Sequence, residues 1–281
     1  MLKKTLLLTS GLLIIFLSST LTRIDRTPYK ALDFYKKSIH EINQLLTKNP
    51  SRSIGDTLLI GFARANLTPS ESAPLAGYGN RRPKEMTSVH DSIYVNTTVI
   101  NNGKNKIAIV SADLLIIPPE VTALLKEKLF NTGWSLPEIF LSATHTHSSL
   151  GGWAPSLVGN MIAGTYNAKY PEFIANQIIA SIQMAEKRLN AGAWSFNELS
   201  IPSLINNRLV GTQGITDPSL KLMALKSGMQ EGVHVFYGAH ATCLSGENKQ
   251  MSRDYPGVFS DWVVNHTPLD FAVYSLSLIH I

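Results

Sequence analysis

Alternating apolar and polar residues predict that much of this chain forms β-strands separated by turns. Residues 59–69 alternate and end in a turn at Pro69, and residues 92–100 are rich in valine, isoleucine and threonine, which is typical of strands. The run Asn101-Asn-Gly103 then favours a tight hairpin. Further strands are expected from Ile139 onward and at residues 106–113, 193–201, 220–226 and 232–240.

Helical periodicity is clearest in three segments. Residues 171–189 carry isoleucines four positions apart, residues 118–130 begin with two prolines, and residues 29–48 hold an approximate apolar stripe. The segment 153–166, rich in glycine and small residues, predicts a loop long enough to form a lid. Because strands interleave with few helices and no regular βαβ repeat, we expect the α/β class, with a mixed β-sheet flanked by helices in a single catalytic-type domain.

The N-terminal segment predicts export. Lys3 and Lys4 precede a nearly uninterrupted apolar run that ends at Leu21. This order is typical of a signal peptide or an N-terminal membrane anchor, which we place at residues 1–22. We therefore expect an exported protein of the cell envelope, periplasmic or extracellular, which contacts the membrane surface through this segment and is anchored there if the segment is retained.

The expected domain boundaries follow from these patterns. Residues 23–57 form a helical spacer and residues 58–274 form the catalytic domain. Residues 275–281 contain no turn signal, no helix-capping residue and no polar C-terminal end. We therefore interpret them as a non-native tail, and the domain as C-terminally truncated.

Composition and charge exclude several classes of protein. The 281 residues are 44% apolar and 16% charged, which is ordinary for a folded domain. The net charge of +5 comes from residues 1–60, with nine basic against four acidic side chains, whereas the rest holds sixteen of each. A neutral body argues against nucleic acid as a partner. Cys243 is the only cysteine, so the chain has no intramolecular disulfide and no four-cysteine zinc site.

Two histidines follow the apolar run that begins at Ile139. Side chains two apart on a strand share a face, so His145 and His147 are expected to line one wall together. A His-x-His pair where a strand enters a glycine-bearing loop suits a metal ligand beside an imidazole that contacts substrate. The spacing alone leaves open that both are polar residues at an exposed strand end.

A second strand-end histidine strengthens the metal interpretation. His240 follows Gly238-Ala239, where small residues allow an ion or another chain to approach. Ligands gathered from separate strands are common in zinc sites, although a hydrogen-bonded core histidine would fit the same pattern. Glu247 is the best local candidate for a third ligand, and Asp113 either orients a ligand histidine or caps a turn. The histidines expected to be solvated or at the core edge are His40, His234 and His266.

These motifs together resemble the neutral/alkaline non-lysosomal ceramidase family over residues 58–265. The most recognisable is Thr144-His-Thr-His-Ser148 with the glycines at 151 and 152. The others, in the family's order, are Gly61-Phe-Ala-Arg-Ala-Asn-Leu-Thr68, Gly77-Tyr-Gly79, His90-Asp91, Val110-Ser-Ala-Asp113, Asn207-Arg208 and Gly238-Ala-His240.

The resemblance implies a zinc-dependent amidase that cleaves the N-acyl bond of ceramide into a sphingoid base and a fatty acid. It implies Zn²⁺ as cofactor, His145 and His240 as its ligands, and His147 and Arg208 as catalytic groups that contact substrate and transition state. It also implies that a glutamate and a tyrosine from farther along complete the zinc shell, so that this chain alone would be inactive. From the residues alone, Arg208 would be a surface salt-bridge residue.

The chain also departs from the family's pattern. The usual Ser-Gly-Pro-Gly-Gly is Ser148-Ser-Leu-Gly-Gly152 here, and the segment after His240 keeps only the outline of the family's sequence. Two alternatives therefore stay open. The chain could be a related zinc hydrolase that acts on another amide or ester, or a catalytically dead relative that binds lipid or glycan.

Overall fold

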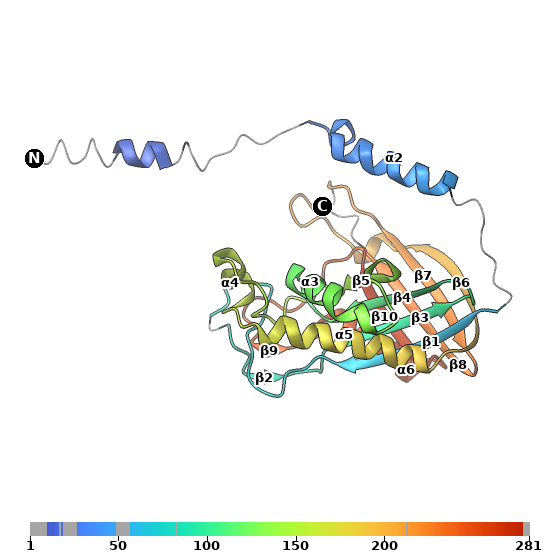
Figure 1. The fold of residues 1–281 in the computed structure, drawn as a ribbon. Coiled ribbons are helices and arrows are strands. Elements are labelled where there is room, and N and C mark those ends of the chain that lie inside the picture. The colour runs from blue at the N-terminus through green and yellow to red at the C-terminus, as the bar shows by residue number, and fades with distance from the viewer. Residues whose placement is uncertain are drawn as a thin grey trace, which may run out of the picture. The chain divides into compact units, whose positions relative to one another are not determined.

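The computed structural model describes residues 10–16, 18, 27–48, 57–82, 84–211 and 213–277. The chain divides into two compact units, residues 1–53 and 54–281 (Figure 1). The segments expected as export signal and as non-native tail lie largely outside the described residues, as do Lys3 and Lys4. Their roles and the proposed domain boundaries stay predictions.

The N-terminal unit is helical where it is described. Residues 10–16 are helical and expose Leu12–Phe16 to solvent. The helix predicted at residues 29–48 is present as a short 3₁₀ helix, η1 (Tyr29–Ala31), followed by α2 (Asp33–Lys48). No helix among the described residues has the length and apolar character needed to cross a bilayer.

The larger unit is built on an eight-stranded sheet in the order β10-β8-β7-β6-β1-β3-β4-β5 (Figure 1). The pairs β4–β5 and β8–β10 are parallel and the others antiparallel, which confirms the mixed sheet. A two-stranded parallel pair, β2 with β9, lies beside it. The strands are β1 (Leu59–Asn66), β2 (Ser88–Val89), β3 (Tyr94–Asn101), β4 (Lys106–Ala112), β5 (Ile139–Ala143), β6 (Asn190–Ser200), β7 (Ser219–Ser227), β8 (Gln230–Tyr237), β9 (Gln250–Met251) and β10 (Phe271–Leu276).

The β3–β4 hairpin forms where the sequence predicts it. Gly103 has a φ of +83°, a conformation that glycine adopts at little cost. The Asn101 side chain accepts a hydrogen bond from the Gly103 amide at 2.8 Å, which closes the turn locally.

Helices α3 (Pro119–Lys128) and α5 (Lys169–Lys187) cover one side of the sheet (Figure 1). The buried face of α5 includes Ile174, Ile178 and Ile182, as its periodicity predicts. Gly61 of β1 lets this helix approach, because a Cβ at that position would lie 2.1 Å from the Ala185 carbonyl oxygen. Short 3₁₀ helices complete this unit: η2 (Leu129–Asn131), η3 (Leu136–Glu138) and η4 (Pro202–Leu204).

Helix α6 (Tyr255–His266) packs against β10, and the sheet curls so that β10 also meets β4 and β5. The Ser111 hydroxyl donates to the Tyr274 carbonyl at 2.6 Å, and the Phe62 and Phe271 rings stack at 5.0 Å. The loop ends of β5 and β8 therefore belong to two parts of one curved sheet. Loops that follow these strands carry the predicted site histidines.

Several expectations need correction. The strand predicted at 232–240 ends at Tyr237, so His240 lies in the loop beyond it. The lid loop contains a helix, α4 (Leu157–Ala163). His234, expected at the core edge, is fully buried, with its Nε2 2.7 Å from the Ser275 hydroxyl. Strand β10 extends through Leu276, two residues into the expected tail.

Candidate metal centre

Three histidines converge at one end of the larger unit. His145 and His147 come from the loop after β5, and His240 from the loop after β8. One ring nitrogen from each lies within 4.8 Å of those of the other two. The ring centroids are 4.5–5.0 Å apart. Both predicted metal ligands and the predicted catalytic histidine thus meet in space.

His145 reaches this cluster through a conformation that the strand interpretation did not foresee. Strand β5 ends at Ala143, and His145 has a φ of +64°, in the left-handed region. The expectation that two strand positions share a face is therefore wrong here, because the chain turns at His145. The turn is held by a hydrogen bond from the His145 amide to the Leu114 carbonyl at 3.0 Å.

The orientation of the His145 ring is fixed by the backbone of the segment that follows β4. Its Nδ1 lies 2.5 Å from the Leu115 carbonyl oxygen. A carbonyl accepts only, so Nδ1 carries the proton and Nε2 keeps its lone pair. Metal-bound histidines are commonly oriented by such a bond from the second nitrogen.

Asp113 does not perform this orienting role. Its carboxylate is buried and accepts a hydrogen bond from the Tyr94 amide at 2.9 Å, next to the start of β3. Burial raises the pKa of the Asp113 carboxyl to about 7, although the nearby Arg253 lowers it. The carboxylate thus joins the end of β4 to the first residue of β3, and caps neither a helix nor a turn.

His147 is packed more tightly than a solvated catalytic group would be. A Cβ at Gly77 would lie 2.6 Å from the Cα and Cβ of His147, so only glycine fits there, at a φ of +123°. The Tyr78 ring tilts against the His147 ring at 4.9 Å between centroids. The His147 Nδ1 is buried and has no hydrogen-bond partner among the described residues.

The environment keeps the imidazoles of His147 and His240 uncharged. Burial lowers the pKa of His147 to about 3, and the neighbouring His145 and His240 lower it further. Burial and His145 likewise lower the pKa of His240 to about 4. Both rings are therefore neutral at pH 7, the form in which histidine binds metal.

This donor set fits a divalent metal ion such as zinc, for which neutral imidazoles are common ligands. Nε2 of His147 and Nε2 of His240 are 2.7 Å apart. Bonds of roughly 2.0–2.1 Å at tetrahedral angles would place two ligand atoms about 3.3 Å apart. A small rotation of either ring would thus allow both to contact one ion.

Arg208 lies close enough to influence the cluster electrostatically. Its charge contributes to lowering the pKa of both His147 and His240. The side chain is exposed, and it forms no hydrogen bond or ion pair with the rest of the described chain. The surface salt bridge considered from the sequence is absent there, and the guanidinium is free to meet a ligand.

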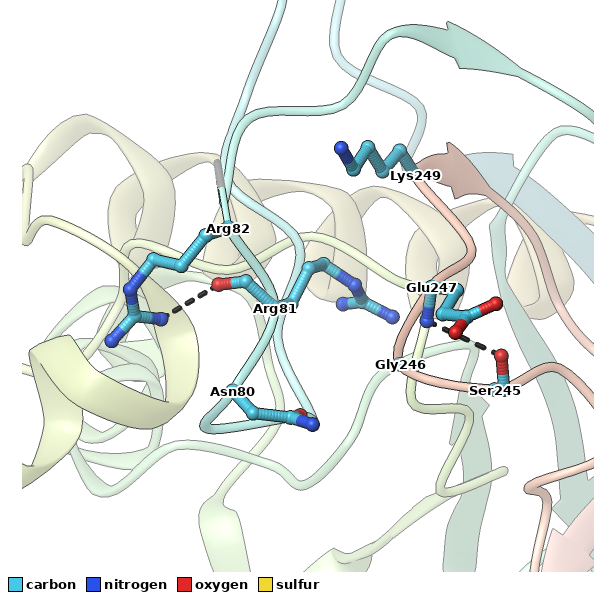
Figure 2. A pocket seen from close by; sticks show the side chains of 7 residues that line it. All are labelled: Asn80, Arg81, Arg82, Ser245, Gly246, Glu247 and Lys249. Atoms are coloured by element: carbon cyan, nitrogen blue, oxygen red, sulfur yellow. Dashed lines mark hydrogen bonds between the residues drawn. The ribbon is translucent and has the colours of Figure 1, made fainter.

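Glu247 is not part of the cluster. Its side chain is exposed in a cavity of about 510 Å³ between residues 80–82 and 245–249 (Figure 2). The grouping of possible metal ligands among the described residues contains the three histidines and no carboxylate. The structure therefore gives no support to Glu247 as the third ligand.

Arg81 is a structural residue of the site that the sequence did not single out. Although charged, it is buried and donates to the carbonyl oxygens of Ala76 and His147 at 3.2 and 2.8 Å and to the Ser148 hydroxyl at 3.3 Å. Figure 2 shows its side chain extending toward the loop of Glu247. It holds the histidine loop against the preceding turn.

Asp254 holds the loop that follows His240. Its carboxylate accepts hydrogen bonds from the amides of Cys243, Leu244 and Tyr255 at 3.2, 2.9 and 2.6 Å. Asp254 is buried and has a φ of +59°, a backbone conformation that is uncommon for residues other than glycine. Strained residues persist where the surroundings fix them, and here three amides do so.

We expect Asp254→Ala to weaken metal binding by about tenfold, because loss of outer partners of a metal site has effects of this size. Asp254→Asn, which keeps one acceptor oxygen, should retain more affinity. Titration of the metal-free protein with zinc measures the change. Asp270→Ala is the matched control, since the Asp270 carboxylate also accepts a backbone amide, that of Glu231. An equal loss in the control would mean general destabilisation.

The known proteins that this chain resembles in sequence and in structure are ceramidases. Residues 58–267 match the family model for the N-terminal part of neutral/alkaline non-lysosomal ceramidases. The neutral ceramidase of Pseudomonas aeruginosa is 24% identical over 230 residues, which are 75% of this chain and 34% of that protein. The chain thus spans about a third of the length of this curated relative.

Solved structures agree at the level of the fold. A ceramidase described as complexed with C2 matches with a TM-score of 0.68 at 20% identity. The crystal structure of neutral ceramidase from Pseudomonas aeruginosa matches with a TM-score of 0.67 at 21% identity. Each match covers 79% of this chain and 38% of the other.

Proposed function

The chain belongs to the neutral/alkaline non-lysosomal ceramidase family, and on that premise we propose that it is the metal-binding part of a zinc-dependent amidase that cleaves the N-acyl bond of a ceramide-like lipid. The observation that carries this proposal is the convergence of His145, His147 and His240, three imidazoles within the matched region. Members of this family depend on a metal in general, and the histidines supply the donors.

We assign His145 and His240 as metal ligands. His145 offers Nε2 because its Nδ1 donates to the Leu115 carbonyl, and His240 is held by the loop that Asp254 organises. When bound, zinc would polarise the amide carbonyl and lower the pKa of a water molecule.

His147 and Arg208 are proposed to act on the substrate. His147 is neutral and beside the ligands, so it can hydrogen-bond the amide oxygen as negative charge develops on it. Arg208 carries a permanent charge and is not engaged by another described residue, so it can stabilise the negative charge that develops on the carbonyl oxygen.

The altered loop bears on the alternatives. Ser149 and Leu150, which replace glycine and proline of the usual pattern, are fully buried. The Ser149 carbonyl accepts a hydrogen bond from the Ala76 amide at 2.9 Å. These residues therefore shape the support of the site rather than its accessible wall, so their replacement is no reason to prefer another amide or ester.

We also propose that the N-terminal segment directs export to the cell envelope. The large apolar side chains at residues 12–16 are exposed in the described helix, which fits a segment that is removed or embedded in a membrane. Fractionation of cells followed by N-terminal sequencing tests this. Mature protein found in the cytoplasm with its first residues intact would contradict export.

The proposed activity predicts zinc content and amide hydrolysis together. The full-length protein is expected to hold one zinc ion and to release fatty acid from ceramide, faster than from an ester of the same acyl chain. Elemental analysis and a panel of N-acyl lipids, simple amides and esters measure both. Zinc without amidase activity would favour a hydrolase for another substrate, and absence of both would favour a lipid-binding relative.

A further inference from the structure

Helix α4 (Leu157–Ala163) presents an apolar surface to solvent beside the metal centre. Leu157, Val158, Met161 and Ile162 are 79%, 63%, 53% and 38% exposed. We call these four side chains the α4 patch. Positions one turn apart on a helix lie on the same face, so the four form one continuous surface. Exposed apolar surfaces of this kind mark sites of interaction.

The patch lies in an unusually uncharged part of the chain. No Asp, Glu, Lys or Arg occurs between Glu138 and Lys169, although 16% of the whole chain is charged. An ordinary solvent-facing loop would carry charged side chains. A charge-free surface is suited to an apolar medium, because burial there desolvates no ion.

Backbone hydrogen bonds connect the patch directly to the loops of the metal centre. The Gly152 amide donates to the Ala163 carbonyl at 2.6 Å, and the Gly77 amide donates to the Ile162 carbonyl at 3.2 Å. Gly77 in turn contacts His147, as described above. The Lys84 ammonium also donates to the Ile162 carbonyl, at 3.2 Å. Whatever covers α4 is therefore placed beside the metal centre.

The size of the patch argues against a protein partner. Four side chains, none larger than methionine, fall short of the ~800 Å² per partner that a stable protein–protein interface buries. Insertion of a short apolar element into a bilayer requires no such area, because each side chain gains independently by leaving water.

We propose that the α4 patch inserts into the surface of a lipid bilayer and holds the metal centre at the membrane that contains the substrate. This inference rests on the proposed lipid amidase function. Because the patch is uncharged, docking should occur on electrically neutral vesicles and persist at high salt, unlike docking by basic residues.

The test compares Leu157→Ser/Met161→Ser with a control that also removes two exposed apolar side chains, Phe130→Ser/Met229→Ser, at positions 88% and 98% exposed. Both are made in the full-length protein. We measure sedimentation with phosphatidylcholine vesicles containing ceramide, hydrolysis of that ceramide, and hydrolysis of a water-soluble short-chain N-acyl amide.

We expect the α4 variant to bind vesicles at least about tenfold more weakly and to lose vesicle hydrolysis in proportion. Its turnover of the soluble amide, and all properties of the control, should match the wild type. Unchanged vesicle binding would overturn the proposal, as would a dimer in the wild type that the α4 substitutions dissociate. A wild type that binds vesicles through α4 but hydrolyses neither substrate would refute the amidase function and leave the docking intact.

Discussion

Alanine in place of His145 or His240 is expected to abolish zinc retention. The two histidines approach from loops 95 positions apart in the sequence, yet one ring nitrogen from each meets in the same cluster. A catalytic zinc site needs three protein ligands and an open position, so loss of one imidazole leaves too few donors. The loss should exceed the roughly 10- to 100-fold effect of removing an outer partner.

The measurement is zinc content after dialysis of the full-length protein, together with competition against a chelator. His266→Ala is the matched control, because His266 is exposed on α6 and its Nδ1 lies 2.9 Å from the Trp262 carbonyl oxygen within the same helix. The control should keep its zinc. Full zinc content in both His145→Ala and His240→Ala would show that the ion lies elsewhere.

The same experiment has a pH dependence that follows from burial of the site. The pKa of His147 is lowered to about 3 and that of His240 to about 4, so neither ring needs to lose a proton at pH 7. Protonation of His240 should therefore not compete with zinc near pH 6.5, where exposed histidines become protonated. Competition by this ligand is expected only as the pH falls toward about 4.

The framework of the fold could be predicted because its signals are local. The isoleucine spacing that predicts α5 and the Asn101–Gly103 sequence that predicts the turn each involve residues close together in the chain. Both elements form where they are expected. Strand β10 and helix α6 were not predicted. Their packing depends on contacts such as the Ser111 hydroxyl with the Tyr274 carbonyl, 163 positions apart, and no local pattern reports such a partner.

The candidate site shows the same division. The histidines were visible because few residue types offer a lone pair to a metal. The turn at His145 could not be predicted from the sequence. Its φ of +64° depends on the hydrogen bond to the Leu114 carbonyl, which lies far away in the sequence. Arg81 was missed for a related reason. An arginine beside a glycine-rich turn is expected to be exposed to solvent. Its burial depends on the carbonyl oxygens of Ala76 and His147, which the folded chain brings next to it.

These supports explain how the site stays open to a ligand. Arg81 fixes the loop of His145 and His147 through its hydrogen bond to the His147 carbonyl. Asp254 fixes the loop that follows His240 through the amides of Cys243 and Leu244. The histidines assigned to the metal thus lie in loops that are held in place. Arg208, assigned to the substrate, has no partner among the described residues.

Replacement of His147 by glutamine or alanine should therefore lower kcat by about 10²–10³-fold, the usual contribution of a hydrogen-bond donor to the developing oxyanion, while zinc stays bound. Arg208→Ala should lower kcat by about 10²-fold through loss of charge stabilisation, and Arg208→Lys should recover part of it. Lys226→Ala, which removes an exposed charge paired with Glu231 at 3.4 Å, is the control.

Steady-state kinetics with a soluble amide and zinc analysis of the same samples separate the roles. A fall in kcat with zinc retained assigns His147 to the transition state, since an interaction made only there affects kcat and kcat/KM alike. Loss of zinc in His147→Ala would instead make it a metal ligand, as its Nε2 at 2.7 Å from that of His240 allows. Unchanged kinetics in Arg208→Ala would remove that residue from the mechanism and leave the three histidines as the whole reactive group of the described chain.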